Sequence, residues 1–273
     1  MNINSKTSLY AVLGYPIDYT LSPFIHNGIF EIKNDNSVYI ALPTKEEELD
    51  TFIDFARIYL KGFNITIPYK RSVLPYIDCF DKSALACDAV NTVKICDKKL
   101  YGYNTDGMGT KIAIERVYLL KNKTVLIKGS GGAARGISAG LYDKDTEIFI
   151  DARNENATKE LIDNIKNNLS DGNISIYDGE KSCDILINAT PLGSVGNEGI
   201  PFSDEQIEFS SLVFDAVYNP RKTQLLQNAE KRGKIIVNGL DMLFWQAVFA
   251  QEIWSEKIDY IKFLPVLEEL KKL

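Results

Sequence analysis

Short apolar runs alternate with amphipathic segments along the N-terminal part of the chain, a pattern typical of an α/β fold. The apolar runs predict buried strands, and apolar residues spaced three and four positions apart predict helices. Ser22 and Pro23 are expected to begin one helix, with Ser22 as its cap. Because strand, helix and strand follow one another, we expect parallel pairing through right-handed crossovers. The expected elements are strands at 8–14, 37–42 and 62–68 and helices at 22–32 and 46–60.

The same alternation resumes near residue 122 and includes a glycine-rich turn. Its order is that of a doubly wound parallel sheet. The C-terminal segment 240–273 is predicted to be helical and is too apolar for a solvated helix, so we expect it to pack against the N-terminal part. The expected elements are strands at 122–129, 146–151, 184–190 and 211–217 and helices at 136–143 and 155–168.

These two series predict two α/β domains. Residues 1–104 would form an N-terminal domain with a mostly parallel sheet, completed by the helices of 240–273. Residues 105–239 would form a doubly wound, Rossmann-like domain. We expect a hinge near 104–106 and 238–240.

Composition and charge exclude several classes of protein. The chain of 273 residues carries a formal net charge of −6, without the basic excess typical of nucleic-acid binding, so no nucleic-acid partner is expected. No apolar stretch reaches the ~20 residues that span a bilayer, and no secretory signal is visible, so we expect a cytoplasmic protein without membrane contact. A single histidine, His26, excludes a multi-histidine metal site. The four cysteines form no CxxC pair and are expected to be small buried filler without disulfides.

The glycine-rich turn lies between a predicted strand and a predicted helix, which is the context of a dinucleotide-binding fingerprint. Small residues let backbone amides approach a pyrophosphate, and the N-terminus of the helix adds partial positive charge. A tight turn without a ligand is the alternative interpretation. The candidate cofactor-binding residues are Gly129, Ser130, Gly131, Gly132 and Ala133, with Ala134 in the last position of the fingerprint.

The end of the next predicted strand carries two residues that favour different cofactors. Asp151 lies about 20 residues after Gly129, where an acidic side chain binds the ribose 2′-hydroxyl of NAD. Arg153 can instead pair with a 2′-phosphate and favours NADP. Because an aspartate in that pocket would repel the phosphate, the sequence leaves the choice between NADP and NAD open.

Polar clusters lie at the ends of strands or in turns of the N-terminal part, in apolar surroundings. Each unsatisfied buried polar group costs on the order of 1–3 kcal/mol, so these side chains need partners. They satisfy one another or bind a polyhydroxylated small molecule, and the number of clusters favours the second interpretation. The clusters are Thr20, Ser22, His26 and Asn27; Asn64, Thr66 and Lys70; Asn91 and Thr92; and Asn104, Thr105 and Asp106.

Hydride transfer at an alcohol carbon requires a group that accepts or donates a proton. Without a zinc site, the candidates are Lys70 and Asp106. A neighbouring carboxylate holds a lysine protonated, so Lys70 can donate to a ketone that is being reduced. In the reverse direction Lys70 must be partly desolvated or share its proton with Asp106. A structural ion pair is the other interpretation.

Taken together and in this order, the motifs resemble the shikimate dehydrogenase family almost from end to end. The stretches that carry the resemblance are TLSPFIHN, NITIPYK, AVNT, GYNTDGMG, GSGGAAR, NATPLG, DAVYNPRKTQLL and GLDMLFWQA. The resemblance implies a substrate-binding and catalytic domain at 1–104, a dinucleotide-binding domain at 105–239, and NADP as cofactor. It also implies reversible reduction of 3-dehydroshikimate to shikimate in aromatic amino-acid biosynthesis.

The resemblance also implies roles for individual residues. Lys70 and Asp106 would form the catalytic dyad, and Tyr218 would lie with Gly239 beside the nicotinamide. The implied substrate-binding residues are Thr20 and Ser22 for the carboxylate, Thr66, Asn91 and Gln246 for ring hydroxyls, and Tyr218. Those implied for the cofactor are the turn residues 129–133, Asp151, Arg153, Ala216 and Gly239.

The chain departs from the family pattern at several positions. Thr20 replaces the usual serine, and Asp88 replaces the usual glycine. Of the usual NADP clamp only Arg153 is kept, because Ala157 replaces a second basic residue, which leaves room for NAD or for dual use. The alternatives are a quinate/shikimate dehydrogenase that uses NAD and a non-catalytic ligand-sensing module, which would be expected to lose the dyad or the glycine turn. We expect a small-molecule substrate and a monomer or homodimer.

Overall fold

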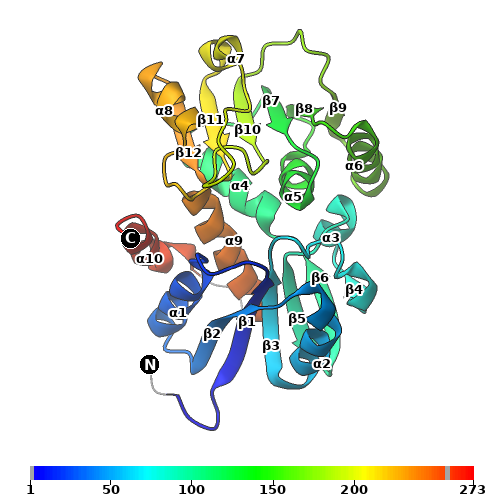
Figure 1. Cartoon of the computed structure of the whole chain (residues 1–273), viewed down its shortest axis with the longest axis vertical. Helices are drawn as coiled ribbons and strands as arrows, with labels where there is room; N and C mark the ends of the chain where they lie inside the picture. The colour runs from blue at the N-terminus through cyan, green and yellow to red at the C-terminus, as the bar shows by residue number, and fades with distance from the viewer. Residues whose placement is uncertain (1–2, 256–258) are drawn as a thin grey trace. The chain divides into compact units, whose positions relative to one another are not determined.

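The computed structural model describes residues 3–255 and 259–273 and contains two sheets of mostly parallel strands, each accompanied by helices (Figure 1). It confirms the α/β class expected from the sequence. Within the described residues, no helix is both long enough and apolar enough to cross a membrane. The chain divides into two compact units. Unit 1 comprises the described residues of Met1–Leu85, Ala89–Thr105 and Gln246–Leu273, and unit 2 comprises Ala86–Asp88 and Asp106–Trp245.

Unit 1 is built on a sheet of β1 (Ser8–Gly14), β2 (Ser37–Pro43), β3 (Leu60–Ile65), β4 (Cys79–Phe80), β5 (Thr92–Cys96) and β6 (Lys99–Tyr103). The strand order is β2-β1-β3-β5-β6-β4. β1 pairs in parallel with β2 and β3, as predicted, whereas β5 pairs antiparallel with β3 and β6. The third predicted strand ends at Ile65 rather than Pro68, because the chain turns there with Tyr69 N donating to Thr66 O at 2.9 Å.

The β5–β6 hairpin is absent from the predicted elements, and its turn explains why. Asp97 and Lys98 both have positive φ, at 49° and 61°. Positive φ at both central residues is the geometry of a type I′ turn, which Asn-Gly or Asp-Gly normally signals. Lysine in the second position removes that signal from the sequence.

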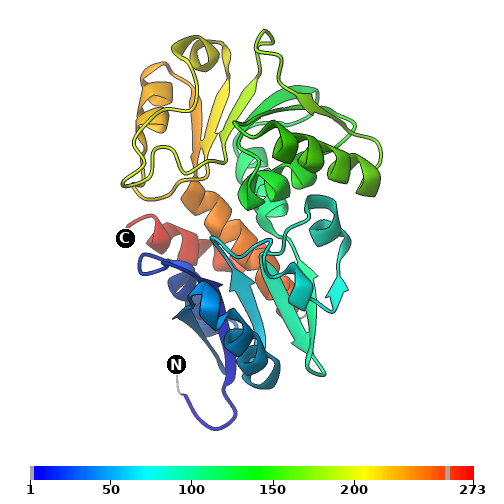
Figure 2. The same ribbon diagram turned by 45° about the vertical axis from the view of Figure 1, so that its right-hand side comes forward.

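Helices cover both faces of the sheet in unit 1. Along β1, Ala11 and Leu13 pack with residues of the helix before β3, whereas Tyr10 and Val12 pack with residues of the first and last long helices. This alternation follows from the two-residue period of a strand. Figure 2 shows the C-terminal helix, Leu264–Leu270, beside the first helix, Ser22–Ile32. The helices are α1 (Ser22–Ile32), α2 (Leu49–Tyr59), α3 (Lys82–Cys87), the second half of α9 (Gly239–Trp254) and α10 (Leu264–Leu270), with 3₁₀ turns at Glu46–Glu48, Leu74–Tyr76 and Tyr260–Phe263.

The predicted bounds of the helix at 22–32 are confirmed, but its predicted cap and the start of the next helix are wrong. The N-cap of α1 is Leu21, and Ser22 makes no capping bond because it already lies in the first turn, where Pro23 is found as predicted. The helix predicted over 46–60 begins as the 3₁₀ turn Glu46–Glu48, and α2 follows it.

Unit 2 is built on a sheet of β7 (Lys123–Lys128), β8 (Thr146–Asp151), β9 (Asn173–Ile176), β10 (Ile185–Asn188), β11 (Leu212–Asp215) and β12 (Ile235–Asn238). The order is β12-β11-β10-β7-β8-β9, and every pair is parallel. This confirms the predicted doubly wound sheet, whose strand order reverses between β7 and β10. The edge strands β9 and β12 are not among the predicted elements, because each is short and partly exposed.

The helices of unit 2 differ from the prediction at the glycine-rich turn. The helix after the turn begins at Gly132 rather than Gly136, so the second half of the turn already belongs to the helix. Gly107 and Gly140 lie where two helices touch, and a Cβ on Gly107 would be 2.3 Å from Gly136 O. The helices are α4 (Asp106–Glu115), α5 (Gly132–Leu141), α6 (Glu155–Asn168), α7 (Asp204–Phe209), α8 (Gln224–Lys231) and the first half of α9.

The C-terminal segment is helical over most of its length. The boundary between the two units falls inside α9, after Trp245. The predicted helical segment 240–273 includes 256–258, which lie outside the described residues.

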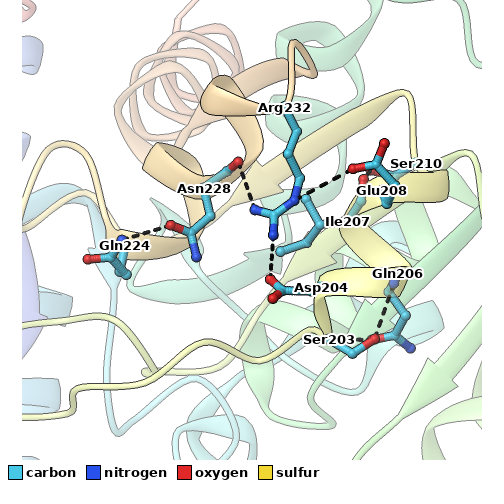
Figure 3. A network of polar contacts seen from close by, with 9 residues as sticks. All are labelled: Ser203, Asp204, Gln206, Ile207, Glu208, Ser210, Gln224, Asn228 and Arg232. Atoms are coloured by element: carbon cyan, nitrogen blue, oxygen red, sulfur yellow. Dashed lines mark hydrogen bonds and ion pairs between the residues drawn. The ribbon is translucent and has the colours of Figure 1, made fainter.

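An exposed polar network joins α7 to α8 (Figure 3). Arg232 donates to Asp204 Oδ1 at 2.7 Å and to Asn228 O at 3.2 Å, and Ser203 caps α7. Because α7 and α8 end just before β11 and β12, Arg232 lies near the amino ends of these parallel strands. Ligands of such sheets bind at the carboxyl ends, so we interpret the network as structural.

Candidate functional site

Asn91 lies just before β5 at the centre of a buried amide and hydroxyl network in unit 1. Its Nδ2 donates to Thr105 Oγ1 at 3.0 Å and to Gln246 Oε1 at 3.4 Å, and its Oδ1 accepts from Thr105 N at 2.8 Å. All three residues are buried. The fold therefore brings together two predicted substrate-binding residues, Asn91 and Gln246, that are far apart in the sequence.

The network extends to Asn64 at the end of β3. Asn64 Oδ1 accepts from the Tyr39 hydroxyl at 2.7 Å, and its Nδ2 donates to Thr92 Oγ1 at 2.9 Å. The Thr92 hydroxyl in turn donates to Asn91 Oδ1 at 2.9 Å. Burial raises the pKa of Tyr39 well above its usual value, so its hydroxyl stays a donor. The side chains of Asn64 and Thr92 thus form hydrogen bonds with neighbouring protein groups, which supports a structural role for these two residues.

A second polar pair in unit 1 lies at the start of α1. The Thr20 hydroxyl donates to Ser22 Oγ at 3.3 Å, with Ser22 buried and Thr20 half-buried. Thr66 is also half-buried and follows β3, where its N–H donates to Leu13 O at 2.9 Å. The side chains of Thr20 and Ser22 are therefore adjacent, as a shared carboxylate contact would require.

The proposed dyad residues occupy well-defined backbone positions. Lys70 is half-buried in the turn after β3, and its carbonyl accepts from Val90 N at 2.8 Å, which ties Lys70 to the residue before Asn91. Asp106 is buried, 3% exposed, and is the first residue of α4. A carboxylate in the first turn stabilises a helix through its dipole. Lys70 belongs to unit 1 and Asp106 to unit 2.

In unit 2 the glycine-rich turn follows β7 and leads into α5. Gly129 has φ 119°, and a Cβ there would lie 3.0 Å from Ala189 O, so only glycine fits. Gly131 is the exposed N-cap of α5, with no side-chain capping bond and open space where a Cβ would be. Ser130, Gly132 and Ala133 are half-buried. The backbone at the start of α5 is therefore accessible to a ligand.

This turn lies where the strand order of the sheet reverses. Gly129 follows β7, and Ala189 follows β10, with Ala189 N donating to Lys128 O at 3.0 Å. Ligands of doubly wound sheets bind at the carboxyl ends of the strands at this reversal. The turn therefore occupies the position expected of a dinucleotide site.

Further along this edge of the sheet, Ala216 and Gly239 lie against each other. A Cβ on Gly239 would be 2.3 Å from Ala216 O, so any larger residue is excluded. Ala216 N donates to Asn188 O at 2.9 Å, and the half-buried Tyr218 follows it. Ala216 directly follows β11, and Gly239 directly follows β12 as the first residue of α9.

Asp151 ends β8 and forms an ion pair with Lys128, the last residue of β7. The two residues lie directly opposite each other in the parallel register. Arg153 is exposed, and Asn154 caps α6 by accepting from Ala157 N at 3.0 Å. Sequence reasoning missed Lys128, although a lysine that follows the apolar run 125–127 just before Gly129 was a usable signal.

Comparisons with known proteins agree with this geometry. A sequence model described as shikimate dehydrogenase substrate binding domain matches residues 12–93. A shikimate dehydrogenase (NADP(+)) of Methanococcus maripaludis is 40% identical over 265 residues, which cover 93% of this chain and 94% of that protein. The chain belongs to the shikimate dehydrogenase family.

Two solved structures of shikimate dehydrogenases are similar to this chain. One, in complex with NADP+, has a TM-score of 0.87 and is 36% identical in sequence. The superposition covers 98% of this chain and 97% of that chain. The other, from Listeria monocytogenes in complex with shikimate and NAD, has a TM-score of 0.85 at 30% identity and covers 100% of this chain and 98% of its own.

The residues at the carboxyl edge of unit 2 fit a dinucleotide. The open space over Gly131 and the uncapped start of α5 fit the backbone approach that a pyrophosphate needs. Ala134, in the third position of the fingerprint, is fully buried, as close packing of the helix on the sheet requires.

The departure of this family member at position 88 has a structural explanation. Asp88 has φ 50°, so the backbone keeps a conformation that favours glycine. Its carboxylate lies 3.7 Å from the guanidinium of Arg135, which is 1% exposed and also lies 3.4 Å from Glu160. Asp88 therefore contributes charge balance to a buried arginine of α5.

A buried carboxyl group, Asp215, is a residue that sequence reasoning missed. It accepts hydrogen bonds from Asn188 Nδ2 at 2.9 Å, Val217 N at 3.0 Å and Thr223 Oγ1 at 2.6 Å. Burial raises the pKa of Asp215 to about 6, although these hydrogen bonds act in the opposite direction. Asp215 thus organises the loops that follow β10 and β11.

The remaining residues of the first polar cluster have structural roles. His26 is fully buried, stacks on Tyr39 at 4.1 Å and contacts Gln251 Nε2 through Nδ1 at 3.1 Å. Burial lowers the pKa of His26 to about 3. Asn27 joins α1 to β2 by accepting from Tyr39 N at 2.9 Å and donating to Pro23 O at 2.8 Å.

The cysteines correct one expectation. All four are free; Cys87 and Cys183 are buried, but Cys79 and Cys96 are exposed, so filler is the wrong interpretation for the latter two. Cys79 begins β4, which pairs in parallel with β6, and Cys96 ends β5, which pairs antiparallel with β6; neither β4 nor β5 was predicted. In the described part of the chain, no group of three or more His, Cys, Asp or Glu side chains is placed to hold a metal.

Proposed function

We propose that this protein is an NADP-dependent shikimate dehydrogenase, which interconverts 3-dehydroshikimate, NADPH and a proton with shikimate and NADP+. The observation that carries the proposal is the buried Asn91–Thr105–Gln246 cluster in a chain that also holds a glycine turn at the reversal of a parallel sheet. The cluster supplies amide and hydroxyl partners for a polyhydroxylated ring, and the turn fits a dinucleotide.

In this proposal, Lys70 and Asp106 transfer the proton. The bound nicotinamide supplies or accepts the hydride at the substrate carbon. Lys70 would donate a proton from its ammonium group to the carbonyl oxygen of the ketone during reduction, and in the reverse direction its neutral amine would take a proton from the alcohol. Asp106 would share this proton with Lys70.

The polar groups of unit 1 would bind the substrate. The adjacent hydroxyls of Thr20 and Ser22 would donate to its carboxylate, because a carboxylate accepts several hydrogen bonds. The ring hydroxyls would be held by Thr66, Asn91 and Gln246, and Tyr218 of unit 2 would complete the set. Residues 1–104 with the C-terminal helices would thus form the substrate domain, which corresponds largely to unit 1, and residues 105–239 would form the nucleotide domain.

The cofactor would lie along the carboxyl edge of the sheet in unit 2. Gly129, Ser130, Gly131, Gly132 and Ala133 would hold the pyrophosphate through backbone amides. Asp151 and Arg153 would face the adenosine ribose and its 2′-phosphate, and Ala216 and Gly239 would line the nicotinamide end. We also propose that the protein acts in the cytoplasm as a monomer or homodimer.

A quinate/shikimate dehydrogenase that uses NAD is the second candidate. The observation in its favour is the carboxylate of Asp151 at the end of β8, the position at which an acid binds the ribose hydroxyls of NAD. The similar structure from Listeria monocytogenes holds shikimate and NAD. A dehydrogenase of the same fold can therefore bind either cofactor.

Initial rates with purified protein decide between these candidates. We expect kcat/KM to be highest for shikimate with NADP+ among the four pairings of shikimate or quinate with NADP+ or NAD+. A higher kcat/KM for quinate with NAD+ would favour the second candidate. Binding of shikimate without reduction of either cofactor would refute both and revive a ligand-sensing module.

A further inference from the structure

The ion pair between Lys128 and Asp151 lies at the carboxyl edge of the sheet in unit 2. The residues end the adjacent parallel strands β7 and β8 and face each other in register. Both side chains are partly exposed, 21% for Lys128 and 37% for Asp151. The Lys128 ammonium also lies over the ring of Phe202, 5.8 Å from the ring centroid, so the lysine side chain has a second neighbour besides Asp151. The pair is therefore part of an accessible surface next to the glycine-rich turn.

A carboxylate at the end of the second strand normally selects against NADP. It accepts hydrogen bonds from the ribose hydroxyls of NAD, and it repels a 2′-phosphate. In this chain the carboxylate of Asp151 is already paired with a cation from the neighbouring strand. Its charge is compensated before any cofactor binds.

The local charge balance then changes in favour of phosphate. Asp151 and Lys128 together contribute no net charge, so Asp151 no longer offsets the positive charge of the exposed Arg153. Without Lys128, the charges of Asp151 and Arg153 would offset each other and leave less positive charge to balance a phosphate. Asn154 is occupied as the cap of α6, which leaves the basic side chains to recognise the phosphate.

We propose that Lys128 determines cofactor specificity: by pairing with Asp151, its ammonium suppresses the repulsion between that carboxylate and a 2′-phosphate and lets the site accept NADP. This proposal shares one assumption with the proposed function, namely that a dinucleotide binds at the glycine-rich turn. Lys128, at the end of β7, would then act in place of the second basic residue of the usual NADP clamp, which is Ala157 in this chain. An ion pair that merely joins two strands is the competing interpretation.

Equilibrium binding tests the proposal without turnover. We would measure the dissociation constants of NADP+ and NAD+ by titration calorimetry for the wild type, Lys128→Met, Asp151→Asn and the double variant. We expect Lys128→Met to raise the Kd of NADP+ about tenfold and to leave that of NAD+ unchanged or lower, because the freed carboxylate repels phosphate and binds the ribose. The double variant should recover NADP+ binding to within about threefold of the wild type, because the repulsive charge is gone.

Lys181→Met is the matched control. Lys181 forms an ion pair with Glu147, near the amino end of β8 and hence away from the proposed cofactor edge. We expect this variant to keep both dissociation constants and each variant to keep the wild-type circular dichroism spectrum.

Two outcomes would overturn the proposal. One is equal weakening of NADP+ and NAD+ binding in Lys128→Met, which is the result expected of a structural pair. The other is a double variant that binds NADP+ as weakly as Lys128→Met does. If the NADP+ dissociation constants of the variants follow the expected order but the protein does not oxidise shikimate, the proposed function is refuted and the role of Lys128 in cofactor binding still holds.

Discussion

Asn91 and Thr105 are joined by two hydrogen bonds, Asn91 Nδ2 to Thr105 Oγ1 at 3.0 Å and Thr105 N to Asn91 Oδ1 at 2.8 Å. Thr105 is the residue before Asp106, and Asn91 follows Val90, whose N–H holds the carbonyl of Lys70. The side chain of Asn91 therefore fixes the backbone next to Asp106, and the backbone N–H of the residue before Asn91 holds the carbonyl of Lys70. Hydrogen bonds of this kind hold the backbone from which the proposed proton-transfer side chains extend.

Lys70→Ala should abolish most catalysis while leaving substrate binding nearly intact. Proton transfer is lost but the carboxylate and hydroxyl contacts remain, so we expect kcat to fall by about 10²-fold or more with little change in the KM of shikimate. Steady-state kinetics at saturating NADP+ measures both constants. A variant that keeps more than about a tenth of the wild-type kcat would refute the role of Lys70.

Arg153→Leu should discriminate between the two cofactors. The guanidinium can pair with a 2′-phosphate but has no equivalent partner on NAD, so we expect the KM of NADP+ to rise about tenfold or more and that of NAD+ to change little. Parallel titrations of both cofactors at fixed shikimate provide the comparison. Equal effects on both would mean that Arg153 does not meet the phosphate.

Alanine at Gly129 and at Gly131 should have separable effects. Gly129→Ala forces a side chain into φ 119° and toward Ala189 O, so we expect a loss of stability of about 1–3 kcal/mol. Gly131 has φ −78° and open space, so Gly131→Ala should keep the melting temperature but weaken NADP+ binding. Calorimetric melting and NADP+ titration measure the two effects. Unchanged binding in Gly131→Ala would argue against a pyrophosphate at this turn.

Asp215→Asn should change how stability depends on pH. Burial raises the folded-state pKa of Asp215 from 3.8 to about 6, so the folded protein holds this proton more tightly than the unfolded chain. The resulting stabilisation is present below pH 3.8 and is lost as the pH rises to about 6. The wild type should therefore lose up to about 3 kcal/mol relative to Asp215→Asn across this window. Urea unfolding of both proteins between pH 3.5 and about 7 measures it, and a constant difference would contradict the buried carboxyl.

His26→Phe should show the opposite trend. Burial lowers the folded-state pKa of His26 from 6.5 to about 3, so the unfolded chain binds the proton more tightly. The stability that neutral His26 contributes is present above pH 6.5 and is lost as the pH falls toward 3. We expect the wild type to lose about 1.4 kcal/mol per pH unit below 6.5 relative to the variant. Parallel acid titrations of unfolding free energy test this, and matching slopes would be inconsistent with a buried neutral ring.

The sequence alone was sufficient for the features that depend on local physics. Alternating apolar runs predicted β1, β2, β7, β8, β10 and β11, because burial of one or both faces of a strand imposes its own periodicity. The glycine turn was visible because the positive φ of Gly129 favours glycine and because a ligand approaches the backbone at Gly131 most closely where no side chain is present. The polar clusters were visible because polar side chains in apolar surroundings need partners.

The tertiary structure decided which of those groups meet. Nothing local pairs Asn91 with Gln246, since only the return of α9 into unit 1 brings an amide from the end of the chain to β5. The ion pair of Lys128 with Asp151 likewise depends on the parallel register of β7 and β8, which is set by the whole sheet. Periodicity identifies a strand, but its neighbours and their register depend on long-range contacts, and the polar contacts that shape the site depend on both.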